Sequence, residues 1–268
     1  MQADITVCIP VRNGANFIES AIQSVREQTF SRWNLLVVDN RSDDATSSVV
    51  GKYLNDARIR FVVNADNLGM AGNFNRCLDL VTTPYYTILC HDDALARPEA
   101  LAHAFDILEC HPDIAAVYSD LVYIDGRGRP TLHRSFKRSG PMDAQRLAKR
   151  SIIEARNLFG IPVLVRSSAA RGLRYDDSLP YLIDLDISIS SARNGSLFHI
   201  SEYLIANRFH GGNGTGKLLA GVDHQMISLA AKHQIPLTSL ERTLIKLNAL
   251  RVGLAKKCFL AWVKYARN

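Results

Sequence analysis

Short apolar runs alternate with amphipathic helical segments in the N-terminal part of the chain, and no other feature restricts the fold as strongly. The runs are rich in β-branched residues and predict strands at residues 5–11, 33–38, 58–63 and 84–89, of which 33–38 and 84–89 are expected to be buried. Apolar side chains at helical spacing predict helices after the first three, around 16–25, 46–54 and 71–81. Such alternation is typical of a mostly parallel sheet. We therefore expect an α/β fold with helices flanking a central sheet.

Polar residues follow three of these strands. Arg12 and Asn13 end the first strand, Asp39 ends the second, and Asp92 and Asp93 end the fourth. A parallel sheet brings such strand ends into one crevice, where α/β proteins bind their ligands. Two neighbouring carboxylates repel each other unless a cation joins them, and oxygen ligands suit Mg²⁺ or Mn²⁺. Two alternatives stay open here: the acidic pair forms a solvated turn, and Asp39 caps the next helix.

Composition and missing motifs narrow the class of protein. No Gly-x-Gly-x-x-Gly follows the first strand and there is no Walker-type loop, which counts against NAD-type and P-loop sites. The formal net charge of +6 favours an anionic partner, but a nucleotide, a membrane surface and nucleic acid all qualify. The five cysteines lack Cys-x-x-Cys spacing, so we expect reduced, mostly buried thiols in a cytosolic protein.

Four motifs now occur in a fixed order: Ile-Pro-Val-Arg-Asn-Gly at 9–14, Val-Val-Asp-Asn-Arg-Ser-Asp-Asp-Ala-Thr at 37–46, Asn-Leu-Gly-Met-Ala-Gly-Asn-Phe-Asn-Arg-Cys-Leu at 67–78, and Cys-His-Asp-Asp-Ala-Leu-Ala-Arg-Pro at 90–98. Together they resemble a GT-A glycosyltransferase of family 2, of the type that builds bacterial surface polysaccharides. The resemblance covers roughly residues 3 to 215. It implies the GT-A fold and an inverting, metal-dependent sugar transfer.

The resemblance also implies roles for residues of the N-terminal half. Those that would contact the nucleotide are Pro10, Val11, Arg12, Asn13, Asp39, Asn67, Gly69, Asn75 and Asp92. Asp39 would accept from a base N–H, and Asp93 would hold Mg²⁺ or Mn²⁺ on the sugar diphosphate. Cys90 stands where many relatives carry the first acid of the metal motif, which leaves a smaller set of carboxylates. Asn67 and Asn75 are open to a second interpretation as caps and turn formers.

In the second half, Asp184 matches the position of the family's catalytic base, although Ile183 replaces the Glu that often precedes it. An inverting transfer needs one carboxylate that takes the acceptor hydroxyl proton. Arg208 would reach the diphosphate, and His210 would add a metal ligand or meet a phosphate oxygen. The alternatives are an Asp that merely stabilises a helix start and a histidine without a role. The polar and basic stretch 131–150 predicts a solvated loop, with a lid over an anionic substrate as the alternative.

The chain is expected to be helical from Gly221 onward, with a break near Ile235-Pro236. An apolar stripe on the last helix comprises Leu240, Leu244, Leu247, Leu254, Cys258 and Ala261, among many basic residues. A basic amphipathic helix can lie at a membrane interface, and packing on the catalytic domain or on another subunit is the alternative. We expect a GT-A catalytic domain at 1–216, with a nucleotide-binding half (1–95) and an acceptor half (96–216), and a helical extension at 217–268.

The expected partners are a nucleoside-diphosphate sugar and a glycan or lipid-linked saccharide acceptor, with no nucleic acid. The expected location is the cytoplasm, with possible peripheral contact with the inner face of the plasma membrane. A nucleotidyltransferase is a second hypothesis, but it should carry a Gly-rich basic phosphate loop, which Val11 to Gly14 is not. A non-catalytic nucleotide-sugar-binding homologue is the third, and Cys90 and Ile183 are the residues that favour it.

Overall fold

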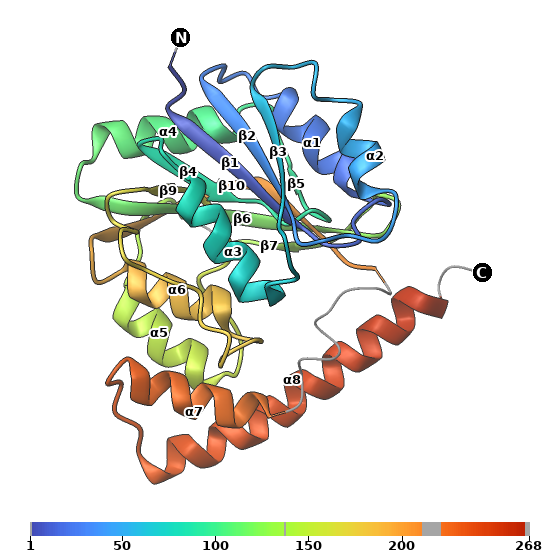
Figure 1. Ribbon diagram of the computed structural model, residues 1–268. Coiled ribbons are helices and arrows are strands. Elements are labelled where there is room, and N and C mark those ends of the chain that lie inside the picture. Colours follow the sequence, from blue (N-terminus) through green and yellow to red (C-terminus); the bar gives the residue numbers. More distant parts are fainter. Residues whose placement is uncertain (1, 137, 211–220, 266–268) are drawn as a thin grey trace.

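The computed structural model describes residues 2–136, 138–210 and 221–265, with the backbone alone for 259–265. Its centre is one sheet with the strand order β3-β2-β1-β4-β9-β6-β10-β5, which β7 and β8 extend by pairing with β6 and β10. Helices lie on both faces of this sheet (Figure 1). The predicted α/β fold, a central sheet with flanking helices, is confirmed.

The N-terminal half of the sheet is parallel. Its strands are β1 (Ile5–Val11), β2 (Trp33–Asp39), β3 (Ile59–Val63) and β4 (Tyr85–Ile88). Their connections contain α1 (Ile18–Arg26), α2 (Thr46–Gly51) and α3 (Gly69–Leu80). Val11 pairs with Asp39 and Cys8 pairs with Ile88, so the polar residues that follow β1, β2 and β4 reach one edge of the sheet.

The C-terminal half departs from the predicted parallel order. Strand β9 (Pro162–Arg166) runs antiparallel between β4 and β6 (Ile114–Ile124), and β10 (Ser196–Arg208) runs parallel to β6. The shorter elements are β5 (Ala94–Leu95), β7 (Pro130–Arg134), β8 (Gly140–Pro141), α4 (Ala100–Cys110), α5 (Ala144–Ile153) and α6 (Ile183–Ser191). The sheet is therefore mixed, and its parallel part is the half that carries the predicted nucleotide site.

Alternate side chains of the buried strands enter two different cores. Ile5, Val7 and Ile9 of β1 join the core that includes residues of α1 and α4, whereas Cys8 joins a cluster with Cys77 of α3. A further cluster on residues of α5, α6 and α7 covers the C-terminal half of the sheet. This burial on both faces explains why the strands are continuous apolar runs.

The segment 131–150 differs most from its prediction. It contains most of β7, all of β8 and most of α5, and is not a solvated loop. Ala148 and Ile152 of α5 are buried and four residues apart, so they form the inner stripe of an amphipathic helix. The helix was not predicted because many basic residues surround this narrow apolar stripe.

Two helices follow, α7 (Val222–Lys232) and α8 (Ser239–Tyr265), and the predicted break near Ile235-Pro236 is confirmed. Met226 and Leu229 of α7 and Ile245 of α8 share a hydrophobic cluster with α5, which joins the predicted extension to the rest of the protein. Its predicted start near residue 217 lies in 211–220, outside the described residues, as does the glycine-rich segment 211–216. Every helix in the described part of the chain is too short or too polar to span a bilayer.

All five cysteines are free thiols. Cys8 and Cys77 are buried, Cys90 is half-buried, and Cys110 and Cys258 are exposed. The prediction of mostly buried thiols is therefore wrong for two of the five, both of which lie on helices whose outer faces meet solvent.

Candidate active site

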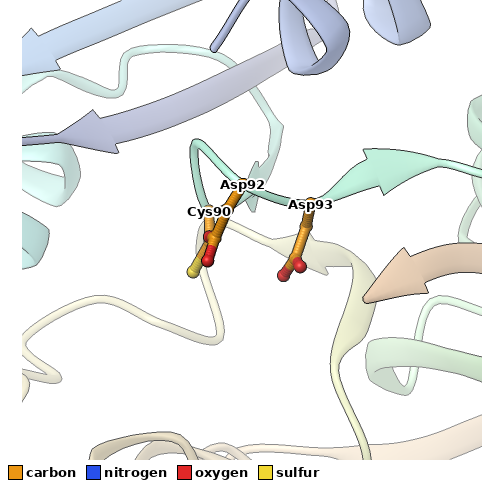
Figure 2. Close-up of side chains that lie close together, drawn as sticks. All are labelled: Cys90, Asp92 and Asp93. Carbon is orange, nitrogen blue, oxygen red and sulfur yellow. The ribbon is translucent and has the colours of Figure 1, made fainter. Parts of the chain in front are cut away.

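The Asp92-Asp93 pair lies in the turn that follows β4 (Figure 2). Asp93 is 4% exposed, and its carboxylate accepts hydrogen bonds from the backbone N–H of Arg208 (2.8 Å) and from the side-chain amide of Asn207 (3.0 and 3.1 Å). Both donors lie at the end of β10, so the turn is tied to the C-terminal half of the sheet. The alternative of a solvated turn is wrong for Asp93.

The Asp92-Asp93 turn fits a hard divalent cation. Cys90 Sγ and a carboxylate oxygen from each of Asp92 and Asp93 lie within 4.8 Å of one another (Figure 2). Burial, followed by the charge of Asp92, raises the pKa of Asp93 well above its ordinary value, and a cation would relieve this cost. Burial also raises the pKa of the Cys90 thiol, which keeps it protonated and a poor ligand. The two carboxylates are thus the ligands that this turn offers.

Histidine 210 also reaches the turn. Its Nε2 lies 3.2 Å from Asp92 Oδ2, and its ring packs on Phe17 with 4.3 Å between ring centroids. Burial by itself would raise the pKa of Asp92, but the hydrogen bond with His210 and the charge of His91 lower it overall. Asp92 is therefore ionised at neutral pH. The structure places His210 beside Asp92, and the predicted contact of His210 with a metal stays a prediction.

The buried side chain of Arg208 holds the Asp92-Asp93 turn in place. Its side chain donates from Nε to the Asp92 carbonyl (2.7 Å), from Nη1 to the Asp125 carbonyl (3.2 Å) and from Nη2 to Ser20 Oγ (3.2 Å). The residue is 5% exposed, so these protein acceptors occupy its guanidinium. In this structure Arg208 fixes the shape of the turn, and its predicted contact with a diphosphate stays a prediction.

The loop after β1 connects Asp39 with the Asp92-Asp93 turn. Asp39 Oδ1 accepts from the backbone and the hydroxyl of Ser42, and Ser42 Oγ in turn accepts from the N–H of Asn13 (2.8 Å). Next to Asn13, Gly14 packs so closely on His91 that an added Cβ would lie 2.6 Å from that ring. Asp39 therefore shapes its own turn and does not cap α2, whose first N–H is capped by Asp44.

Of the other residues predicted to contact the nucleotide, Pro10 and Val11 are buried at the end of β1 and Arg12 is exposed. Asn67 is exposed in the loop before α3, and Gly69 is exposed at the first position of that helix. Val11 pairs with Asp39, and the neighbouring Asn40 bonds to Asn67 and Gly69, so these residues gather near the end of β2.

Asn40 was not predicted, yet it organises the loop around Asn67 and Gly69. Its amide nitrogen donates to Asn67 Oδ1 (2.8 Å) and to the Gly69 carbonyl (2.9 Å), and its Oδ1 accepts from the N–H of Leu68 (2.8 Å). Asn64, at the end of β3, donates to the same Oδ1. The available signal was that Asn40 and Asn64 both directly follow strands of the parallel half.

Asn75 joins the two halves of the site. Its side-chain amide donates to the Tyr175 carbonyl (3.0 Å) and accepts from the Tyr175 N–H (2.8 Å). The amide thus holds the segment before α6 against α3. The predicted contact of Asn75 with a nucleotide stays a prediction.

Asp184 lies in the first turn of α6, beside the acidic turn. Ile183 and Ile187 of the same helix pack in a small cluster with Phe74 of α3 and with Cys90. The charge of Asp184 is near enough to contribute to the raised pKa values of Cys90 and Asp93. Its side chain meets solvent on one side and protein on the others, and this desolvation raises the pKa of its carboxyl to about 6. A carboxylate with such a pKa is suited to accept a proton near neutral pH.

A groove of about 670 Å³ lies at the other end of β4, between α3 and the segment after β9. Two of its three arginines already have protein partners: Arg166 donates to Tyr85 and Ile114, and Arg174 pairs with Asp79. We place the functional site at the Asp92-Asp93 edge instead, because the strand ends, the paired carboxylates and Asp184 meet there.

The sequence model described as glycosyl transferase family 2 matches residues 6–178. This chain is a family 2 glycosyltransferase. The match covers the four strands of the parallel half, the Asp92-Asp93 turn and β9, and ends just before α6. The family assignment therefore rests on the part of the chain that holds the acidic turn.

Relatives of the glycosyltransferase are about a quarter to a third identical to it over the regions that align. Protein CgeD of Bacillus subtilis is 31% identical over 142 residues, which are 50% of this chain but only 33% of CgeD. An uncharacterized glycosyltransferase of Methanocaldococcus jannaschii, MJ1057, is 27% identical over 199 residues, 72% of this chain and 67% of that protein. The chain thus spans about a third of CgeD and two thirds of MJ1057.

Solved structures of low sequence identity share the fold. Staphylococcus aureus TarS 1–349 in complex with UDP-GlcNAc superposes with a TM-score of 0.72 at 17% identity, over 91% of this chain and 70% of that one. The mannosyltransferase PcManGT of Pyrobaculum calidifontis, in complex with GDP-Man and Mn²⁺, gives a TM-score of 0.63 at 16% identity, over 93% and 70%. These similarities confirm the GT-A fold.

Proposed function

We propose that this glycosyltransferase moves a sugar from a nucleoside diphosphate to a hydroxyl of a glycan or lipid-linked acceptor, with inversion and with a divalent metal, in the synthesis of bacterial surface polysaccharide. One observation carries the proposal. Asp184 lies beside the Asp92-Asp93 turn without being part of it, so a proton acceptor and a metal-binding pair share one site. An inverting transfer needs both at once.

The donor would bind along the ends of β1, β2 and β4. Asp39 Oδ2 accepts no hydrogen bond from the described residues, whereas Oδ1 is held by Ser42, so one carboxylate oxygen is left for a base N–H. The loop that Asn40 holds, with Asn67 and Gly69, would close over the nucleoside. Asp92 would meet the ribose and Asp93 the diphosphate end.

The acceptor hydroxyl would lie next to Asp184, which takes its proton as the oxygen attacks the anomeric carbon. Held by Asp92 and Asp93, with His210 as a further ligand, Mg²⁺ or Mn²⁺ would supply positive charge against the departing diphosphate. The hydrogen bonds of Asn207 and Arg208 to Asp93 orient that carboxylate before donor arrives.

A binding and hydrolysis panel tests the proposal. Melting temperature is measured with UDP, GDP, CDP and dTDP sugars, each with and without Mn²⁺, and release of nucleoside diphosphate is followed in the same mixtures. We expect one donor to raise the melting temperature only when Mn²⁺ is present, because ligands that bind only the folded state stabilise it. Slow release of the diphosphate should accompany that shift. A donor that binds without any release of nucleoside diphosphate, with or without acceptor, would favour the non-catalytic alternative.

The proposal includes a cytoplasmic enzyme that touches the inner face of the plasma membrane through α8. Five leucines on this helix are 38–69% exposed: Leu240, Leu244, Leu247, Leu250 and Leu254. Ile245, on the opposite side of the helix, is buried against α5 and α7. The alternative that this stripe packs on the catalytic domain is therefore wrong for these leucines. Within 240–258 the basic residues are Arg242, Lys246, Arg251, Lys256 and Lys257, and Glu241 is the sole acid.

Replacement of Leu247 and Leu250 by Glu should release the protein from anionic vesicles. Each buried leucine contributes about 1.5–3 kcal/mol, so the double change should weaken binding at least about 100-fold. Co-flotation with phosphatidylglycerol vesicles measures it, and Leu54→Glu is the control because Leu54 is 45% exposed and lies elsewhere. Unchanged flotation would contradict the membrane contact, and a stable dimer lost in the double variant would favour a second subunit on this stripe.

A further inference from the structure

Helix α6 carries two acidic residues that point in opposite directions. Asp184 and Asp186 are two residues apart, which is about 200° around an α-helix. Asp184 is exposed and near enough for its charge to act on Cys90 and Asp93, whereas Asp186 is 1% exposed and buried in the protein. A contact that holds Asp186 therefore also sets the direction in which Asp184 points.

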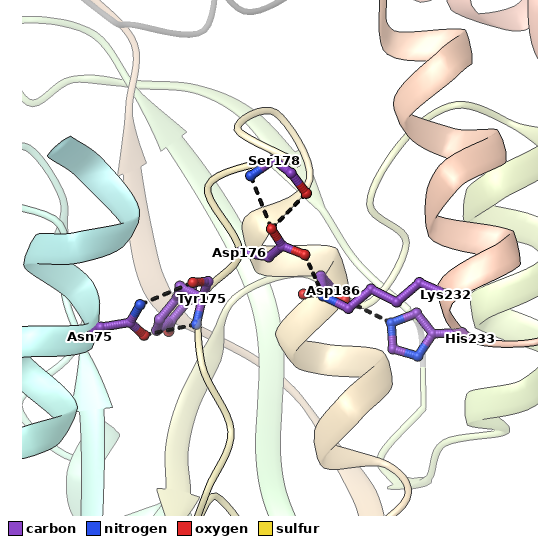
Figure 3. A network of polar contacts seen from close by, with 7 residues as sticks. All are labelled: Asn75, Tyr175, Asp176, Ser178, Asp186, Lys232 and His233. Carbon is purple, nitrogen blue, oxygen red and sulfur yellow. Dashed lines mark hydrogen bonds and ion pairs between the residues drawn. The ribbon is translucent and has the colours of Figure 1, made fainter.

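Two side chains at the end of α7 hold Asp186 (Figure 3). Lys232 Nζ lies 2.8 Å from Asp186 Oδ2, and His233 Nε2 lies 2.7 Å from Asp186 Oδ1. An ionised carboxylate only accepts hydrogen bonds, so the proton of this contact is on His233 Nε2. His233 is itself buried, and Arg193, just after α6, donates to its carbonyl (3.0 Å). Both oxygens of Asp186 are thus fixed by charged or polar groups of a second helix.

Lys232 also binds the segment that leads into α6. Its Nζ lies 2.7 Å from Asp176 Oδ2, and the other oxygen of Asp176 accepts from the N–H and the hydroxyl of Ser178 (Figure 3). The hydrogen bond from Lys232, together with those from Ser178, lowers the pKa of Asp176 to about 2. The adjacent Tyr175 is the residue that Asn75 of α3 holds. One ammonium group therefore joins α7, α6 and the segment tied to the donor half.

We propose that Lys232, acting with His233 on Asp186, is a positioning residue that fixes the rotation of α6 and thereby aims Asp184 at the acceptor hydroxyl. This inference rests on the proposed function of Asp184 as the base. A carboxylate about 6 Å from the helix axis moves about 1 Å when the helix turns by 10°. A displacement of about 1 Å at a reacting group can lower the rate about 100-fold. The three contacts of Lys232 and His233 oppose that rotation.

The test compares Lys232→Met, which keeps the aliphatic stem and removes the charge, with Lys232→Arg, which keeps the charge. The matched control is Lys149→Met, because Lys149 is 41% exposed, Lys232 is 39% exposed, and Lys149 also pairs with an acid, Glu241, but away from α6. We expect Lys232→Met to lower kcat about 10- to 100-fold, with KM for the donor within twofold, and Lys232→Arg to recover most of it. Lys149→Met should match the wild type.

Hydrogen exchange of the α6 amides is measured on the same variants without substrate. We expect faster exchange over 183–191 in Lys232→Met and not in Lys149→Met, because α6 loses an anchor. If Lys232→Met does not fold, His233→Leu against His233→Gln tests the second anchor in the same way, since Gln retains an N–H donor. Unchanged exchange, or faster exchange with unchanged kcat, overturns the inference. If the wild type transfers no sugar, the proposed function is refuted. Faster exchange in Lys232→Met would then still show that Lys232 anchors α6.

Discussion

We expect Asp184→Asn to lower sugar transfer about 10²- to 10⁴-fold and to leave donor binding intact, because the amide cannot take the acceptor proton. In the proposed site the donor is bound by the strand ends and the Asp92-Asp93 turn, and among the described residues the Asp184 side chain makes no hydrogen bond to that turn. Turnover is measured by release of nucleoside diphosphate in the presence of acceptor, and donor affinity by calorimetry. Substitution is nearly isosteric, so the fold should be retained.

The control for this change is Asp177→Asn, an exposed acid in the segment that leads to α6. It should transfer sugar at the wild-type rate. Near-normal turnover of Asp184→Asn would remove Asp184 from the mechanism and leave the site without its base.

The same carboxyl should set the acid limb of the pH–rate profile. Desolvation raises its pKa to about 6, and only the ionised form accepts a proton. Turnover should therefore fall about tenfold per pH unit below pH 6 and level off above it. For stability the sign is opposite: the folded state binds this proton more tightly than the unfolded chain, so this group's contribution to stability decreases as pH rises from about 4 to about 6. Asp184→Asn should remove both effects.

The second large effect is expected for Asp93→Asn, which should abolish the stabilisation of the protein by Mn²⁺ and donor together. Asp93 is one of the two carboxylates of the turn, and loss of a ligand should weaken Mn²⁺ binding by more than the roughly 10- to 100-fold that outer-shell changes cost. Without metal, the variant should melt no lower than the wild type above neutral pH. The reason is that burial beside Asp92 raises the pKa of Asp93, so its ionised form destabilises the empty site.

Thermal shift with a Mn²⁺ titration, alone and with donor, measures the effect of Asp93→Asn. Asp79→Asn serves as the control, because Asp79 pairs with Arg174 on the surface and lies outside the acidic turn. A Mn²⁺-dependent shift that survives in Asp93→Asn would assign the metal to other ligands, with Asp92 and His210 the first candidates.

The N-terminal half of the fold could be predicted from sequence because its strands are apolar runs that end in polar residues. The meeting of Asp39 and Asp92 at one edge follows from that pattern. The antiparallel insertion of β9 could not be predicted, because strand direction within a sheet depends on the path of the connection and not on the composition of the strand. Helix α5 was missed because its inner stripe is only a few residues wide.

The candidate site divides in the same way. Most residues predicted from the family pattern lie at strand ends, where a motif fixes both residue type and place, whereas Asn75 and Asp184 lie on helices α3 and α6. Asn40 and Lys232 act through several partners distant in sequence, and nothing local marks such residues. Arg208 shows the reverse: an arginine beside a diphosphate site predicts an anion contact, yet backbone carbonyls and a serine hydroxyl occupy it here.

The central position of β9 has a consequence for how this protein is made. Strand β4 borders β1 on one side and receives its other neighbour, β9, only from residues 162–166. During synthesis the β4 edge that pairs with β9 therefore stays unpaired until more than half of the chain has left the ribosome. Open edges of this kind are where nascent chains associate wrongly. Truncation before β9 should accordingly yield an aggregating fragment, and the donor half should not be separable as a folded unit.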